Sequence, residues 1–170
     1  MSIETPPANW TRPGELSGAE GDLPAGKVVI VASRYNAGIC DALVDGALET
    51  LGDAGYGAHD TPVVRVPGAW ELPTVVRTVI DQDDVIAVIA LGCVIKGETT
   101  HDQHINRAVS DALMNLAVDS GLPIGFGLLT CNTLEQAIQR SGGSVGNKGV
   151  ESAEAVLELL RLNERLAEGL

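Results

Sequence analysis

The side chains best suited to chemistry in this 170-residue chain stand together in the segment Gly97-Glu98-Thr99-Thr100-His101. A glycine followed by small polar residues exposes successive backbone N–H groups, which form a nest for phosphate oxygens. The imidazole of His101 exchanges protons near neutral pH and is a natural general acid or base. The segment therefore predicts an anion loop beside a proton-transfer group. The alternative is that Thr99 or Thr100 only caps a following helix.

Two cations further along the chain extend this prediction. The planar guanidinium of Arg140 suits a phosphate, although a solvated cation at a helix C-terminus is the plainer interpretation. Lys148, taken alone, is typical of an exposed turn. His104 follows His101 at the spacing of a His-x-x-His metal pair, but a third ligand is missing from the pattern. We therefore expect a phosphate site and no metal.

Other residues are suited to a flat polar ligand. Tyr35 can stack on a ring and Asn36 can bind ring carbonyl and N–H groups, unless they are a rim tyrosine and a helix-capping asparagine. Trp70 offers an apolar face. Glu71 can accept hydrogen bonds from hydroxyls, or it is an ordinary glutamate in a first helical turn. Phe126 is interpreted as a core residue or as one packed at a subunit contact.

Alternating strands and helices must position these groups. Continuous β-branched runs predict strands over residues 27–33, 61–66, 85–91 and 124–129. Apolar residues at helical spacing predict helices over residues 39–51, 72–80, 105–116, 133–141 and 150–160. This order indicates an α/β three-layer sandwich with a four-stranded parallel flavodoxin-like sheet flanked by helices. Ligands bind beyond the carboxyl ends of such strands, where most of the candidate residues stand.

Composition excludes some classes of binding partner and indicates the cellular compartment. A formal net charge of −12 disfavours nucleic acid and anionic membranes as partners. Cys40, Cys93 and Cys131 show no metal-ligand spacing and are typical of reduced thiols in a cytosolic protein. With no signal-peptide pattern and no apolar run of membrane-spanning length, we expect a cytoplasmic protein. Residues 1–26, rich in proline, are expected to form a flexible arm before a single domain over residues 27–170.

Four separated motifs resemble those of the lumazine synthase family. They are Val66 to Pro73, Leu91 to His101, Gly125 to Arg140, and Asn147-Lys148-Gly149 before an alanine-rich helix. The resemblance extends from Lys27 to about Leu160. It implies condensation of 5-amino-6-(D-ribitylamino)uracil with 3,4-dihydroxy-2-butanone 4-phosphate. The products would be 6,7-dimethyl-8-ribityllumazine, phosphate and water, as a step of riboflavin biosynthesis that uses no cofactor.

The resemblance also implies a role for each matching position. His101 matches the proposed general acid and base, and Arg140 matches the arginine that binds phosphate. Phe126 and Lys148 match residues that reach a neighbour's site, so each site would span two subunits. The phosphate loop is matched by Gly97, Glu98, Thr99 and Thr100. Contacts to the pyrimidine ring and its ribityl chain are matched by Tyr35, Asn36, Ala69, Trp70, Glu71, Cys93, Val94 and Ile95.

The same resemblance implies an assembly. The family forms homopentamers, and some members join twelve of them into an icosahedral shell of sixty subunits. The turn from Ser141 to Gly149 is short, as in shell-forming members. Riboflavin synthase is a further expected partner, beside the small-molecule substrates. After His101 the chain departs from the family pattern with Asp102-Gln103-His104, and no role is assigned to these residues.

Two other functions fit parts of the pattern. A cage protein of the same fold would hold flavin or lumazine with little turnover, although the retained His101 and Arg140 argue for catalysis. A flavodoxin would need a phosphate loop rich in serine, threonine and glycine after the first strand, which residues 33–36 do not supply. A receiver module would need acids at strand carboxyl ends, whereas Asp83 and Asp84 precede a strand.

Overall fold

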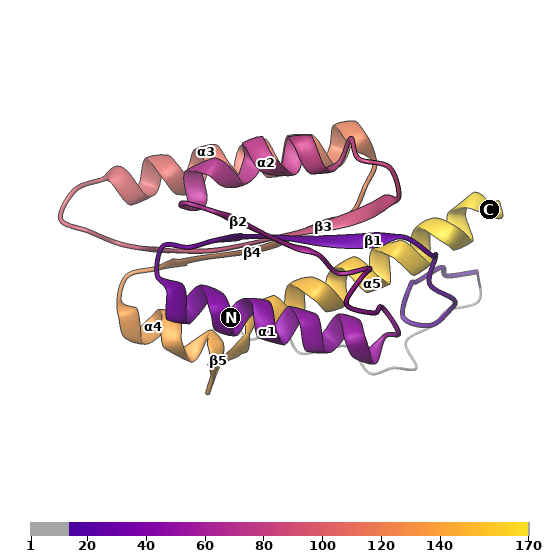
Figure 1. Ribbon diagram of the computed structural model, residues 1–170, viewed down its shortest axis with the longest axis horizontal. Coiled ribbons are helices and arrows are strands. Elements are labelled where there is room, and N and C mark those ends of the chain that lie inside the picture. Colours follow the sequence, from indigo (N-terminus) through magenta and orange to yellow (C-terminus); the bar gives the residue numbers. More distant parts are fainter. Residues whose placement is uncertain (1–13, 170) are drawn as a thin grey trace.

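The structure, a computed structural model, describes residues 14–169 of the chain (Figure 1). Its strands are β1 (Lys27–Ser33), β2 (Val63–Val66), β3 (Val85–Ile95), β4 (Ile124–Cys131), β5 (Ser141–Gly143) and β6 (Gly146–Asn147). Its helices are α1 (Ala37–Asp53), the 3-10 turn η1 (Ala69–Glu71), α2 (Leu72–Val79), α3 (His101–Ser120), α4 (Leu134–Gln139) and α5 (Lys148–Ala167).

The four long strands form one parallel sheet in the order β2-β1-β3-β4. Helices α2 and α3 cover one face, and α1 and α5 cover the other (Figure 1). This arrangement confirms the predicted three-layer α/β sandwich. Because all four strands are parallel, their carboxyl ends meet at one edge of the sheet, which we call the carboxyl edge.

Each face of the sheet carries its own hydrophobic core, since successive strand side chains point to opposite faces. Val28, Ile30 and Ala32 of β1 pack toward α1 and α5. Val29 and Val31 of the same strand pack toward α2 and α3. Burial on both faces explains why the strands are continuous apolar runs without polar alternation.

Two strands differ in length from the prediction. β2 begins at Val63, after Pro62, because proline has no N–H to donate to the ladder. β3 extends past Gly92 to Ile95, where the predicted strand ended at Leu91. Pairing with β4 continues to the Ile95–Cys131 position, so the tertiary contact overrides the breaking tendency of the glycine.

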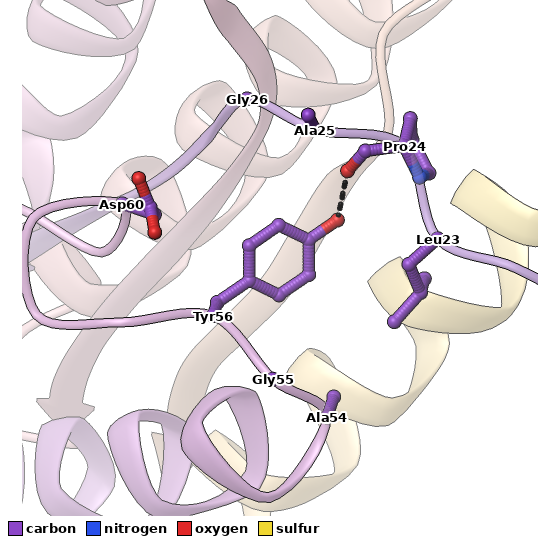
Figure 2. A pocket seen from close by; sticks show the side chains of 8 residues that line it. All are labelled: Leu23, Pro24, Ala25, Gly26, Ala54, Gly55, Tyr56 and Asp60. Carbon is purple, nitrogen blue, oxygen red and sulfur yellow. Dashed lines mark hydrogen bonds between the residues drawn. The ribbon is translucent and has the colours of Figure 1, made fainter.

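The segment before β1 lies against the domain without forming a helix or strand. The hydroxyl of Tyr56 donates to the carbonyl oxygen of Pro24 at 2.8 Å, beside a cavity of about 290 Å³ (Figure 2). Burial raises the pKa of Tyr56, which keeps its hydroxyl protonated as a donor. Further on, Nη1 of Arg165 in α5 donates to the carbonyl of Ser17 at 2.6 Å. Residues 1–13 of the predicted arm lie outside the described residues.

Burial of the thiols gives the fold a predictable response to alkaline pH. Desolvation raises the pKa of Cys93 to about 12, far above that of an exposed thiol. The unfolded chain therefore loses this proton at a lower pH than the folded chain does. We expect the free energy of unfolding to be intact below pH ~8.5 and to fall as the pH rises toward 12. Urea titrations at pH 8 and pH 10.5 would measure the loss in free energy of unfolding for wild type and for Cys93→Ala. The loss should be smaller in the variant, which lacks this thiol.

Candidate active site

The carboxyl edge brings four chain segments together, one at the end of each long strand. After β1, the N–H of Arg34 donates to the carbonyl of Val66 at 2.8 Å, and the N–H of Tyr35 donates to that of Pro67 at 3.1 Å. After β3, the N–H of Lys96 donates to the carbonyl of Cys131 at 2.8 Å. Hydrogen bonds between neighbouring loops thus hold the strand ends in a fixed arrangement.

Tyr35 and Asn36 form a tight turn between β1 and α1. The ring of Tyr35 is 72% exposed, free to stack on a ligand. Asn36 adopts a left-handed conformation at φ 58°. Its amide does not cap α1, so the capping interpretation is wrong. Its Nδ2 instead donates to the carbonyl of Cys93 at 2.9 Å, which leaves Oδ1 without a partner among residues 14–169.

The Gly68–Glu71 turn follows β2 and presents a second ring. Oε2 of Glu71 accepts from the N–H of Gly68 at 2.9 Å, so the glutamate closes its own turn as a helix-terminal residue. This bond fixes the carboxylate while a second oxygen stays available as an acceptor. Ala69 and Trp70 lie on the short η1 turn between Gly68 and Glu71. Ala69 is buried, and Trp70 is 58% exposed.

The end of β3 offers backbone groups rather than side chains. β1 pairs with β3 only as far as Leu91, whereas β4 pairs with it up to Ile95. Among the described residues, positions 92–95 of β3 therefore have a strand neighbour on one side only. The Cys93 carbonyl already accepts from Asn36, and the remaining backbone N–H and C=O groups on the open side can bind the edge of a flat heterocycle in the way another strand would. Cys93, Val94 and Ile95 lie at this open stretch.

The phosphate-loop candidates and His101 connect β3 to α3. Residues 96–100 form no helix or strand, and His101 is the first residue of α3. Its N–H donates to Oγ1 of Thr99 at 3.4 Å, while the side chain of Thr100 makes no capping bond. The capping interpretation is thus wrong for Thr100, the N-cap residue, while Thr99 lies outside the helix and accepts one long bond from its first amide. The segment from Gly97 to His101 is exposed, as an open ligand loop would be.

A separate cavity of about 330 Å³ brings Phe126, Arg140 and Lys148 together. Arg140 is half-buried at the end of α4, and its Nη1 donates to the carbonyl of Gln136 at 3.1 Å. This bond fixes the guanidinium in the cavity wall. Cys131 also lines the cavity, and burial raises its pKa against the opposing effect of the Arg140 charge. The cavity thus combines two cations with an aromatic ring.

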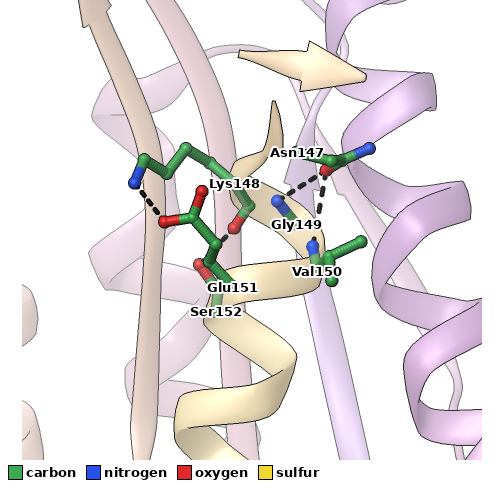
Figure 3. Close-up of polar contacts among 6 residues, drawn as sticks. All are labelled: Asn147, Lys148, Gly149, Val150, Glu151 and Ser152. Atoms are coloured by element: carbon green, nitrogen blue, oxygen red, sulfur yellow. Dashed lines mark hydrogen bonds and ion pairs between the residues drawn. The ribbon is translucent and has the colours of Figure 1, made fainter. Parts of the chain in front are cut away.

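The start of α5 places Lys148 in this cavity. Oδ1 of Asn147 accepts from the N–H groups of Gly149 and Val150 at 2.8 and 3.4 Å, which caps the helix (Figure 3). Lys148 is therefore in a first helical turn, not in an exposed turn as its sequence suggests. Nζ of Lys148 is paired with Oε2 of Glu151 (Figure 3). Sequence reasoning missed Glu151, although its i,i+3 spacing from Lys148 is a signal for such a pair.

Phe126 is 49% exposed, so its interpretation as a core residue is wrong. The reason is its place on β4, an edge strand with a strand neighbour on one side only among the described residues. Phe126 pairs with Ala90, which pairs with Val31 of β1. From a strand spacing of ~4.8 Å and a rise of ~3.3 Å per residue, Phe126 lies roughly 12 Å from Ser33, where β1 ends before the Tyr35 turn. One chain therefore does not bring all of the candidate residues into one small pocket.

Replacing His101 tests the proton-transfer prediction. We expect His101→Ala to lower kcat about 10²-fold, the lower end for a general acid or base, because this side chain is exposed. His59→Ala is the control, since that side chain is 90% exposed in a loop of the opposite end. Steady-state assays of the expected condensation reaction would measure kcat for both variants. A His101 variant as active as the control would remove this residue from the chemistry.

Comparisons with known proteins identify the family. The model of the family 6,7-dimethyl-8-ribityllumazine synthase matches residues 25–164. A 6,7-dimethyl-8-ribityllumazine synthase of Rhodopirellula baltica is 62% identical over 151 residues, or 89% of this chain and 97% of its own length. Proteins of the same name from Xylella fastidiosa and Xanthomonas campestris are each 46% identical over 149 residues, or 86% of this chain and 97% of their own. The chain belongs to the 6,7-dimethyl-8-ribityllumazine synthase family.

Proposed function

We propose that this chain condenses 5-amino-6-(D-ribitylamino)uracil with 3,4-dihydroxy-2-butanone 4-phosphate. It forms 6,7-dimethyl-8-ribityllumazine and releases phosphate and water, as a transferase of riboflavin biosynthesis that needs no cofactor. Family membership over residues 25–164 carries this proposal. The carboxyl edge supports it, because its exposed ring, its acceptor oxygens and its open strand backbone suit a hydroxylated flat heterocycle.

The pyrimidine binds at the carboxyl edge in this proposal. Tyr35 stacks on the ring, and the free Oδ1 of Asn36 accepts from a ring N–H. The open side of β3 at Cys93 and Ile95 supplies backbone contacts. The ribityl hydroxyls donate to the second carboxylate oxygen of Glu71, next to Ala69 and Trp70. Val94 completes the ring contacts.

The phosphate lies between a cation and a loop. The guanidinium of Arg140, held by Gln136, binds two of its oxygens in a fork. Loop N–H groups from Gly97 to Thr100 would supply further donors, together with the threonine hydroxyls and the neighbouring subunit's Lys148, which shares one cavity with Arg140 of the same chain. A few local cations are needed here because the net charge of −12 repels an anion at long range.

The chemistry follows from holding two reactants together. The pyrimidine amine attacks the ketone carbon, and loss of water gives a Schiff base. Elimination then expels phosphate, and ring closure with loss of a second water completes the lumazine. His101 moves the protons, while Arg140 stabilises the charge on the departing phosphate. Most of the rate comes from the shared orientation of the two substrates.

Steady-state formation of the yellow product tests the function directly. Purified protein is mixed with both substrates, and lumazine absorbance and phosphate release are followed from pH 6 to pH 8. The proposal requires both products in equal amounts. Tight binding of lumazine without turnover at any pH would favour the cage protein instead.

We propose that the working unit is a homopentamer, with each site shared by two subunits. The roughly 12 Å between Phe126 and the end of β1 at Ser33 supports this, since a neighbour's Phe126 and Lys148 complete the ring site more readily than the chain's own. Exposed apolar side chains on α3, Met114 at 64% and Val118 at 72%, offer surface for such an interface. Assembly of twelve pentamers into a shell, with riboflavin synthase as partner, is a further proposal that rests on the family and on the short β5–β6 hairpin.

Phe126 gives a test of the assembly. We expect Phe126→Asp to shift the particle mass in light scattering from a pentamer or larger particle to smaller species, because a charge replaces an apolar side chain at the contact. Phe126→Leu keeps an apolar side chain and should retain the assembly. An unchanged particle mass for the aspartate variant would place the interface elsewhere.

The proposed compartment is the cytoplasm. Within residues 14–169 no helix is long and apolar enough to cross a bilayer. The buried thiols of Cys40, Cys93 and Cys131 are free, which a reducing compartment favours.

A further inference from the structure

Two buried side chains converge on the backbone carbonyl of Tyr35. Ser33 and Cys40 are both 0% exposed. Sγ of Cys40 donates to the carbonyl oxygen of Tyr35 at 3.2 Å, and Oγ of Ser33 donates to the same oxygen at 3.5 Å. The two side chains also lie 3.3 Å from each other, so they form a single polar group inside an apolar core.

The Tyr35 carbonyl depends on these side chains. In the first turn of α1, the amides of Ile39 and Cys40 donate to the carbonyl of Asn36 at 3.0 and 3.1 Å. The preceding carbonyl, that of Tyr35, therefore lies just outside the helical hydrogen-bond ladder. Buried backbone acceptors are almost always paired, and here side chains supply the donors that the helix does not.

The turn needs such support because its backbone is unusual. Asn36 has φ 58° and ψ 50°, a left-handed conformation that residues other than glycine rarely adopt. Such a conformation persists where its surroundings determine it on several sides. Asn36 is held by Cys93, and the N–H of Tyr35 is held by Pro67. The Ser33–Cys40 pair fixes the remaining polar group of the turn.

We propose that the Ser33–Cys40 pair positions the Tyr35 ring for stacking on the pyrimidine substrate. Both side chains are fully buried, so they act through the Tyr35 carbonyl and touch no substrate. Tyr35 is 72% exposed, so few neighbouring side chains orient its ring. The orientation of the ring then depends on the backbone of Tyr35, whose carbonyl the Ser33–Cys40 pair holds. This inference rests on the proposed function, because it gives Tyr35 a pyrimidine to hold.

The protonation state of the thiol agrees with this role. Burial is the largest influence on Cys40 and raises its pKa, opposed by the hydrogen bond from Ser33 and the charge of Arg65. Cys40 therefore keeps its proton at neutral pH and stays a hydrogen-bond donor. A hydroxyl in the same place would serve equally, whereas a methyl group would not.

Substitution at Cys40 tests the proposal. We expect Cys40→Ala to raise KM for the pyrimidine about fivefold, the size of effect that the loss of one neutral hydrogen bond gives. In the same variant, kcat should change less than about twofold, and so should KM for the butanone phosphate. Cys40→Ser keeps a donor and should restore KM. Val44→Ala, which truncates another buried residue of α1, is the control and should leave KM at the wild-type value.

A double substitution separates positioning from general damage. In a Tyr35→Ala background the ring is gone, so adding Cys40→Ala should raise KM no further. Full additivity of the two effects would overturn the proposal, as would an unchanged KM in Cys40→Ala or a raised KM in Val44→Ala.

Direct binding distinguishes this inference from the proposed function. The affinity of wild type and Cys40→Ala for the pyrimidine substrate alone is measured by calorimetry, which needs no turnover. About fivefold weaker binding by the variant supports the positioning role even if the wild type makes no lumazine, a result that would refute only the function. Equal affinities, with active wild-type enzyme, would refute only the positioning role.

Discussion

Replacing Arg140 with alanine is expected to lower kcat for lumazine formation about 10²- to 10³-fold, the usual loss when one preorganised donor to a developing anion is removed. The guanidinium is half-buried and one of its donors is fixed by Gln136, so its other donors are held in the cavity wall and need no reorganisation to bind an anion there. Lys148 lies in the same cavity, but Glu151 pairs with it and it cannot replace the fork. Phosphate release measured at saturating substrates would report the loss.

Two further variants test whether the loss comes from the Arg140 guanidinium. Arg140→Lys keeps the charge without the planar fork, so about one-tenth of the wild-type kcat is expected. Arg77→Ala removes an exposed arginine on α2 that pairs with Asp81 at 2.5 Å, and activity should stay at the wild-type level. If Arg140→Ala matched Arg77→Ala in both kcat and KM, the phosphate would have to bind elsewhere.

Gly149→Ala should be among the most damaging single-methyl additions to the fold. A Cβ at Gly149 would lie 1.9 Å from the carbonyl oxygen of Leu43, where α5 crosses α1, and neither backbone has room to yield locally. We expect a loss of about 3 kcal/mol or more in the free energy of unfolding, the upper range for overpacking. Urea denaturation measures it.

Gly52→Ala provides the matched comparison. Gly52 lies in α1, and a Cβ there would meet nothing within 4 Å. The same chemical change should therefore stabilise the protein by about 0.5 kcal/mol, through helix propensity and a smaller unfolded-state entropy. Equal effects at the two positions would mean that α1 and α5 do not approach each other as closely as the structure has them.

The fold was predictable because burial on both faces leaves a strong periodic signal. Each long strand is a β-branched run, and each long helix has its own apolar stripe, so element order followed from pattern. The extension of β3 beyond Gly92 was not predictable. It depends on β4, which lies about thirty residues later and supplies the pairing up to Cys131.

The candidate site was predictable in residue type but not in contacts. Motifs indicated Tyr35, Asn36, Glu71 and Arg140, and the structure puts the first three at the carboxyl edge. A sequence does not show that the Asn36 amide turns away from its own helix to reach Cys93. Nor does an aromatic in a strand reveal an edge position, which is why the sequence left Phe126 open between a core residue and one packed at a subunit contact.

The course of α5 has a practical consequence for immobilised enzyme. The helix runs from Lys148 in the cavity wall to Ala167, about 30 Å away at 1.5 Å per residue. Its far end lies beside the segment anchored by Ser17, on the side where β1 begins (Figure 1). A biotin tag or surface tether at the end of α5 should therefore leave the carboxyl edge facing the medium, and a bead-bound preparation should keep the turnover of free protein.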